Sequence, residues 1–238
     1  YVFRACFIDP FQGAVMARFA VEDLRGRRLA ILFDFKQDYS VGLAEFFRQK
    51  ARELGAEIVA DERYTSGDID FRPQLTTIRA ANPDAVFVPG YYTEVGLIAR
   101  QAREKGLNVP LLGGDGWDSE KTVEIGGVAV EGYYFSTHYA ADSDNPRVQE
   151  FVRKFAAKNG ATPDAMAALG YDAAGILADA LGRAGGTDGA KLRDAIAATS
   201  GFDGVTGRIS MDEKRNARKD AVVLEIAVLM AQFPSKQI

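Results

Sequence analysis

The stretch Asp84 to Ser119, DAVFVPGYYTEVGLIARQAREKGLNVPLLGGDGWDS, predicts one strand–helix–strand unit. Its apolar runs at 85–88 and 109–112 are continuous, as expected for parallel strands covered on both faces. Between them, apolar residues spaced three and four apart predict an amphipathic helix, which Gly106 would end in a left-handed conformation. Both loops of this unit follow the carboxyl end of a strand, where open α/β sheets bind their ligands.

The same alternation of strand-like and helix-like segments extends over residues 1–139. Further strands are predicted at 1–8, 28–33, 56–64 and 130–139, and further helices at 11–24, 39–54 and 70–78. Strands that alternate with helices are typical of a doubly wound α/β lobe with a mostly parallel sheet. We therefore expect this fold class for the first part of the chain.

The alternation of strands and helices ends after Tyr139, because helices are predicted from about 145, 162 and 189 without a strand between them. Strand-like segments follow only at 207–211 and 221–226. Since an apolar helix face must be buried against something, the segment 140–238 is expected to be part of a second lobe whose main strands lie elsewhere. Side chains on these helices should then be exposed, or contact another segment, a second chain or a domain-swapped neighbour: Phe151, Phe155, Ile176 and Leu177.

Composition excludes several classes of protein. The net charge of −4 and pI near 5.2, without a run of basic residues, argue against a nucleic-acid partner. The single cysteine, Cys6, cannot form an internal disulfide. No apolar stretch reaches the ~20 residues that span a bilayer, and the chain does not begin with a signal-peptide pattern. A targeting segment would therefore lie outside these 238 residues.

Catalytic, metal and cofactor motifs are absent from the sequence. It contains no GxSxG, HExxH, CxxC or GxxxxGK[ST] pattern, and no cluster of metal ligands. The glycine-rich segment 182–189 follows a helix rather than a strand, which favours a helix connection over a phosphate-binding loop. The lone His138 lies in a strand-like run and is interpreted as structural. We therefore expect no cofactor and no metal.

Three loops instead suggest a binding site. The segments DFKQDYS (34–40), PGYYT (89–93) and GGDGWD (113–118) each follow a predicted strand, so a parallel sheet would bring them to one edge. An acidic group among aromatic rings suits a ligand with a cationic head and an apolar body. The alternative is that the aromatic residues pack and Asp115 supports a glycine turn. The residues concerned are Tyr39, Tyr91, Tyr92, Asp115 and Trp117.

Six runs then carry a resemblance to a known family: FRACFIDPFQG, DYSVGLAEFF, VPGYYTEVGLIARQAR, GGDGWDS, EGYYFSTHY and ALGYDAA. In order and spacing they resemble the branched-chain amino-acid (Leu/Ile/Val) binding proteins of bacterial ABC transporters, which are type I periplasmic binding proteins with two α/β lobes. The resemblance implies that Tyr39 and Tyr91 bind the ligand and that Asp115 meets its α-ammonium group. Phe11, Tyr92 and Trp117 are further candidates.

The resemblance also implies a domain organisation. Residues 10–130 would form one complete lobe, 1–9 and 131–139 would be crossing strands between lobes, and 140–238 would complete the other lobe. Two departures stand out. The chain lacks the family's initial βα units, which build most of the first lobe and hold the α-carboxylate of the ligand. Its end, AVLMAQFPSKQI, lacks the family's β-hairpin turn, so the pairing of 227–238 stays open.

The function implied is that of a non-enzymatic, extracytoplasmic solute-binding protein that delivers a small amino acid to an ABC permease. It would be periplasmic, or extracellular and lipoprotein-anchored. The alternative is a sensory module of the same fold, such as an amide or amino-acid sensor or a receptor ectodomain. An enzyme of doubly wound fold is disfavoured by the missing motifs. The identity of the amino acid or amide is left open.

Overall fold

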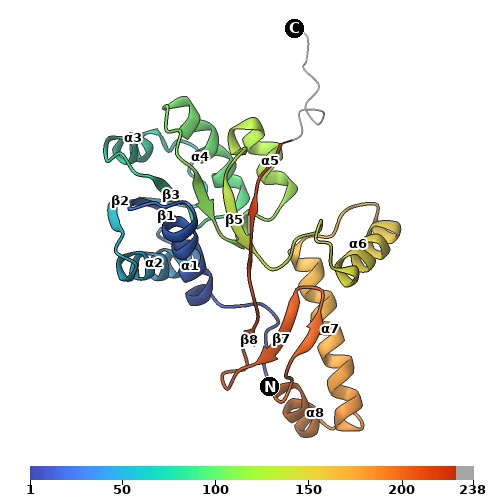
Figure 1. Cartoon of the computed structure of the whole chain (residues 1–238). Coiled ribbons are helices and arrows are strands. Elements are labelled where there is room, and N and C mark those ends of the chain that lie inside the picture. Colours follow the sequence, from blue (N-terminus) through green and yellow to red (C-terminus); the bar gives the residue numbers. More distant parts are fainter. Residues whose placement is uncertain (229–238) are drawn as a thin grey trace. The chain divides into compact units, whose positions relative to one another are not determined.

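The computed structural model describes residues 1–228, and within them the fold divides into two compact units (Figure 1). The first, which we call the sheet unit, comprises residues 9–136 and 223–228. The second, the helical unit, comprises Tyr1–Ile8 and Thr137–Val222. Each unit has hydrophobic clusters of its own.

The sheet unit is built on a six-stranded sheet of order β2-β1-β3-β4-β5-β9. The pairs β1–β2, β1–β3, β3–β4 and β4–β5 are parallel, which confirms the predicted α/β fold class. The strands are β1 (Arg28–Asp34), β2 (Glu57–Tyr64), β3 (Ala85–Phe87), β4 (Leu111–Gly113), β5 (Tyr134–Thr137) and β9 (Val222–Glu225).

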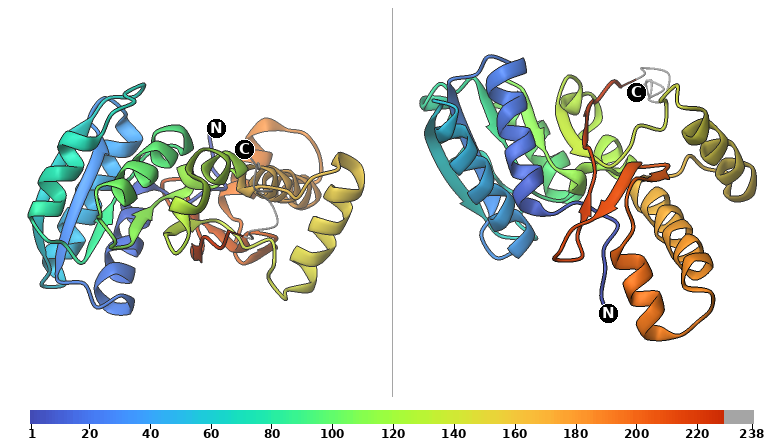
Figure 2. Two further views of the ribbon diagram at one scale, coloured as in Figure 1. Left: turned by 90° about the horizontal axis from the view of Figure 1, so that it is seen from above. Right: turned by 60° about the horizontal axis from the view of Figure 1, so that its bottom comes forward.

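Helices cover both faces of this sheet (Figures 1 and 2). One face packs against α1 (Asp9–Arg18), the π-helical turn η1 (Phe19–Asp23) and α2 (Asp38–Glu53). The other packs against α3 (Arg72–Ala80), α4 (Tyr92–Glu104), α5 (Glu120–Gly126) and the 3₁₀ turn η3 (Gly127–Val130). Alternate residues of each strand point to opposite faces, so continuous apolar runs such as 85–88 supply both cores.

Local signals in the sequence account for the ends of several helices. Gly55 and Gly106 follow α2 and α4 with φ of 79° and 69°, the left-handed conformation that glycine adopts without a steric penalty. On α6 (Pro146–Asn159), the Asn145 side chain accepts a hydrogen bond from the Arg147 N–H at 2.9 Å. These ends match the predicted ones.

The helical unit contains α6, α7 (Ala165–Ala184) and α8 (Gly189–Ala197). Its sheet is small and antiparallel, of order β6-β7-β8, and consists of β6 (Phe202–Gly204), β7 (Gly207–Met211) and β8 (Ala217–Arg218). Phe151 and Ile176 are buried, Phe155 is half-buried and Leu177 is 43% exposed. No complete parallel sheet covers these helices within the part of the unit that the structure describes.

Three features differ from the expectations. Residues 1–8 form no strand. The Arg4 N–H donates to the Arg215 carbonyl at 3.3 Å. An apolar run forms a strand only where a neighbouring strand provides a series of backbone hydrogen-bond partners. The segment from Val223 belongs to the sheet unit rather than to the unit of residues 140–222, because β9 adds to the edge beside β5. Most of the open segment 227–238 lies outside the described residues.

Candidate functional site

One edge of the sheet unit gathers three of the predicted side chains. Tyr39 lies in the first turn of α2, Tyr91 precedes α4, and Asp115 opens the 3₁₀ turn η2 (Asp115–Trp117) that follows β4. The strands before these loops are β1, β3 and β4, which are neighbours in the sheet and run parallel. Their carboxyl ends therefore meet at one edge, as the loop spacing predicted.

The phenol of Tyr39 links the members of this group. Its hydroxyl donates to Oδ1 of Asp115 at 2.8 Å and accepts from the backbone N–H of Gly116 at 3.1 Å. Its ring stacks on Tyr91, with 5.1 Å between centroids and 29° between planes. Tyr91 itself is 42% exposed, so its ring forms an aromatic surface that a ligand can reach.

The electrostatics of the edge follow from burial and negative charge. Burial, and then the charge of Asp115, raise the pKa of Tyr39 well above its ordinary value. Burial raises the pKa of Tyr91 as well, followed by the charges of Asp115 and Asp9. Both phenols therefore stay protonated at neutral pH beside carboxylate charge, and the Tyr39 hydroxyl donates a hydrogen bond to it. Such an edge favours a cationic group over an anionic one.

The turn around Asp115 needs its glycines. A Cβ on Gly114 would lie 2.6 Å from the Tyr39 hydroxyl oxygen, and one on Gly116 would lie 2.6 Å from the carbonyl oxygen of Gly90. A Cβ on Gly113 would lie 2.2 Å from the Trp117 ring. The glycines thus let the backbone close tightly around aromatic side chains.

Trp117 is a packing residue in this structure. Its side chain is 1% exposed, and its indole N–H donates to the Val88 carbonyl at 3.0 Å. Tyr92 begins α4 and carries the Lys121 ammonium 5.7 Å from its ring centroid. Phe11 lies in the first turn of α1 and is 38% exposed. Phe11 and Tyr92 can therefore be reached from outside, whereas Trp117 supports the loop from within the core.

Sequence reasoning missed Asp9 as a member of this edge. It opens α1, and its Oδ2 would lie 3.4 Å from a Cβ on Gly42, which is one turn after Tyr39 in α2. Its charge also acts on the Tyr91 hydroxyl. The available signal was the Asp-Pro pair at the end of an apolar run, although such a pair by itself indicates only a turn.

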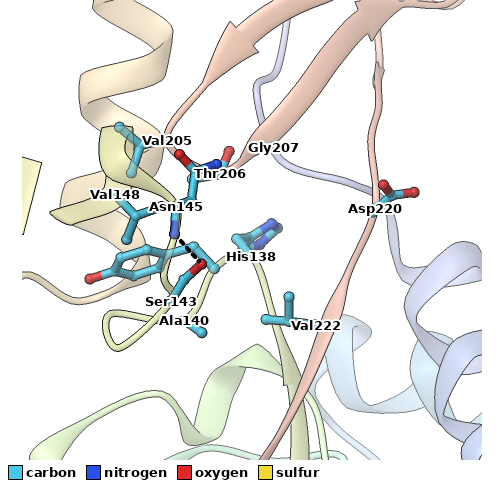
Figure 3. Close-up of a pocket in the computed structure, with 11 residues that line it drawn as sticks. His138, Ala140, Ser143, Asn145, Val148, Val205, Thr206, Gly207, Asp220 and Val222 are labelled. Carbon is cyan, nitrogen blue, oxygen red and sulfur yellow. Dashed lines mark hydrogen bonds between the residues drawn. The ribbon is translucent and has the colours of Figure 1, made fainter.

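The helical unit has a separate cavity of about 160 Å³ (Figure 3). His138, Thr206 and Asp220 contribute polar groups to its wall, and the His138 ring stacks on Phe7 at 3.8 Å. His138 is buried, which agrees with a structural role. Among residues 1–228, no group of three or more histidine, cysteine, aspartate or glutamate side chains could hold a metal ion, and no helix has the length and apolar character to cross a membrane.

Comparisons with known proteins place these features in a family. The model of the periplasmic binding protein family matches residues 1–227. Leu/Ile/Val-binding protein homolog 1 of Brucella suis is 32% identical over 222 residues, which are 93% of this chain and 59% of that protein. The leucine-, isoleucine-, valine-, threonine- and alanine-binding protein of Pseudomonas aeruginosa is 30% identical over 90% of this chain and 56% of its own length.

A solved structure supports the same family assignment. The leucine-binding protein LivK of Thermotoga maritima superimposes with a TM-score of 0.87 at 46% identity, over 95% of this chain and 65% of that one. The chain thus spans less than two thirds of the length of each of these relatives. The matches confirm the resemblance that the sequence motifs carried.

Proposed function

The chain belongs to the periplasmic binding protein family, and from this premise we propose that it is the ligand-capturing part of a solute-binding protein for a branched-chain amino acid. The relatives are solute-binding proteins rather than enzymes, as predicted. Two of them are named for leucine, isoleucine and valine among their ligands, and a third for leucine. These names support the proposed ligand class without fixing which amino acid this chain takes.

The observation that carries the proposal is the Asp115 carboxylate at the edge of a parallel sheet, which accepts a hydrogen bond from Tyr39, whose ring stacks on Tyr91. In the proposed mode, this carboxylate pairs the α-ammonium group of the ligand. The exposed ring of Tyr91 covers part of its apolar side chain, with Phe11 and Tyr92 as outer contacts. Trp117 is not included, because it is buried behind the loop.

The other half of the site belongs, in this proposal, to a segment outside these 238 residues. The group that binds the α-carboxylate would be supplied there, and closure of two lobes on the ligand would be driven by contacts that only the closed state makes. The sheet unit would be one lobe. The helical unit would form part of the other, with its helices covered by the remaining segment or by a second chain.

Delivery to an ABC permease from a periplasmic location is the role that this family membership supports. We extend it to this chain as part of the same proposal, with anchoring through a lipid as one form of the location. A sensory module that binds the same ligand would use the same site. A membrane-spanning or DNA-binding segment in the complete protein would distinguish a sensor from a transport protein.

Substitution of Asp115 by asparagine tests the proposal. The change keeps the shape of the side chain but leaves the ligand ammonium without a counter-charge, which should cost about 3 to 5 kcal/mol, or a hundred-fold or more in affinity. Isothermal calorimetry of the complete protein with L-leucine, L-isoleucine and L-valine measures it. An affinity equal to that of the wild type would remove Asp115 from the site.

A matched control is Asp23→Asn. Asp23 is an exposed aspartate of the same unit, and it lies at the end of η1, shortly before β1 begins. It is therefore at the opposite edge of the sheet from Asp115. The control removes the same charge from the unit and should leave the affinity unchanged.

A further inference from the structure

The hydroxyl of Tyr39 is enclosed by the turn that carries Asp115, and we propose that Tyr39 is a positioning residue that fixes this carboxylate for an ammonium group. In this role Tyr39 acts through Asp115 instead of serving mainly as an aromatic wall for the ligand. The inference rests on the proposed function, since it takes Asp115 to be the group that binds the ammonium.

The hydrogen bonds give the hydroxyl a defined direction. It accepts from the Gly116 N–H at 3.1 Å and donates to Oδ1 of Asp115 at 2.8 Å. Because the donor to Tyr39 and its acceptor belong to consecutive residues, the phenol closes a small ring with the turn itself. A rotation of the Asp115 side chain would break the bond to Tyr39, so the phenol fixes one carboxylate oxygen in space.

The backbone leaves little room for another arrangement. A Cβ on Gly114 would lie 2.6 Å from the Tyr39 hydroxyl oxygen, and one on Gly116 would lie 3.3 Å from it. The turn therefore fits closely around this oxygen on two sides. A buried hydroxyl that is so enclosed loses little entropy when it forms its hydrogen bonds, because its position is already set.

The other end of Tyr39 is also anchored. Its neighbour Ser40 is fully buried, accepts from the Asp34 N–H at 2.9 Å and donates to the Pro89 carbonyl. These bonds tie the first turn of α2 to the ends of β1 and β3. The stacked ring of Tyr91 covers one face of the Tyr39 ring. The sheet thus fixes the position of the Tyr39 phenol, and the phenol in turn fixes the position of the Asp115 carboxylate.

Tyr39→Phe removes the hydroxyl and keeps the ring, which separates the two roles. If the hydroxyl positions Asp115, the affinity of the complete protein for L-leucine should fall about ten-fold, as expected for a hydrogen bond to a charged group. The acid limb of the pH profile of binding should also move to higher pH, because a donated hydrogen bond favours the charged carboxylate. A ring that only packs against the ligand would produce neither effect.

Tyr133→Phe is the matched control. Tyr133 is a fully buried tyrosine of the same unit, and its hydroxyl has no hydrogen-bond partner among the described residues. Loss of that hydroxyl should change neither the affinity nor the pH profile. Apo melting temperatures of both variants show whether the fold is intact.

A double-mutant cycle with Asp115→Ala separates the possible outcomes. If Tyr39 acts through Asp115, Tyr39→Phe has no further effect on affinity once Asp115 is alanine. An unchanged affinity and pH profile for Tyr39→Phe, with binding lost in Asp115→Ala, overturns the positioning role but leaves the proposed function standing. Wild-type affinity in Asp115→Ala overturns both. Equal losses from Tyr39→Phe in the two backgrounds would show that Tyr39 acts independently of Asp115.

Discussion

The sheet unit and the helical unit both contain amphipathic helices, such as α4 and α6, but they bury them differently. In the sheet unit, α1 to α5 lie on a parallel sheet with two apolar faces, and many of the core side chains have no exposed surface. In the helical unit, the helices meet a small antiparallel sheet and leave Met166, Tyr171 and Leu177 between 43% and 61% exposed. A helical pattern thus predicts that a face will be covered, but not by what.

The helical unit also buries charge. The Asp172 carboxylate of α7 accepts from the backbone N–H groups of Val205 and Thr206 at 2.7 and 2.8 Å, and from the Thr206 hydroxyl at 2.7 Å. Lys219 contacts the same hydroxyl. The unit is therefore held partly by a polar cluster, which we define as Asp172, Thr206 and Lys219, whereas the sheet unit depends mainly on apolar packing.

The largest expected effect is a difference in the loss of stability caused by core substitutions in the two units. Phe47→Ala removes a fully buried ring that stacks on Phe87 at 4.2 Å, and should destabilise the protein by about 3 to 5 kcal/mol. Phe155→Ala removes a half-buried ring of α6 and should cost about 1 kcal/mol. Urea unfolding of both variants measures the difference. Equal losses would mean that the helical unit is covered as completely as the sheet unit.

A somewhat smaller effect is expected from the polar cluster. Asp172→Asn replaces an oxygen acceptor by an amide that cannot accept from every donor around it, and it leaves Lys219 without its nearby negative charge. Loss of a buried charged hydrogen-bond acceptor of this kind should cost about 2 to 3 kcal/mol. Hydrogen exchange would show reduced protection at Val205 and Thr206. Unchanged exchange there would contradict the importance of the cluster.

Lys219 adds a pH dependence to the same cluster. Burial lowers its pKa from 10.5 to about 8, against the opposing influence of Asp172 and Cys6. Between these values the unfolded chain binds more protons than the folded one, so stability should rise as the pH rises from about 8 toward 10.5. Lys219→Met has no titrating group at this position and should lack this rise in stability with pH. Thermal melts of both proteins at pH 7 and 10 test it.

The smallest effect concerns the ligand edge. Tyr91 is 42% exposed and stacks on Tyr39, so Tyr91→Ala should weaken leucine binding by about 1 kcal/mol, or roughly five-fold, and leave the apo melting temperature nearly unchanged. Tyr39→Ala should lower both, because Tyr39 is hydrogen-bonded within the fold. Calorimetry combined with apo melting curves distinguishes the two tyrosines. A large drop in the apo melting temperature of Tyr91→Ala would make it a packing residue.

The sequence predicted the sheet unit well because its signals are local. Apolar runs of strand length, the stripe on α4 and the glycines at 55 and 106 each specify their own element. The convergence of Tyr39, Tyr91 and Asp115 followed from one topological rule for parallel sheets. The sequence could not show that the Trp117 indole donates to Val88, because burial of a loop residue depends on the loop's own closure.

The features that the sequence did not predict share one physical cause: each depends on contacts with residues far away in the chain. Residues 1–8 have the composition of a strand, but pairing is decided by whichever backbone lies beside them. The segment 222–225 was expected in the helical unit, yet β9 joins the sheet beside β5. Asp172 carries no sequence signal for its role, since its three donors belong to residues more than thirty positions away.

The boundaries between the units also determine when each unit can be completed during synthesis. The chain leaves the helical unit after Ile8, returns at Thr137 and leaves it again after Val222. The strands β1 to β5 and their helices emerge from the ribosome as one continuous stretch that can begin to fold by itself. The contacts that residues 1–8 make within the helical unit are to residues more than a hundred positions later, such as His138 and Arg215. Residues 1–8 are thus synthesised well before the residues that they contact in this unit.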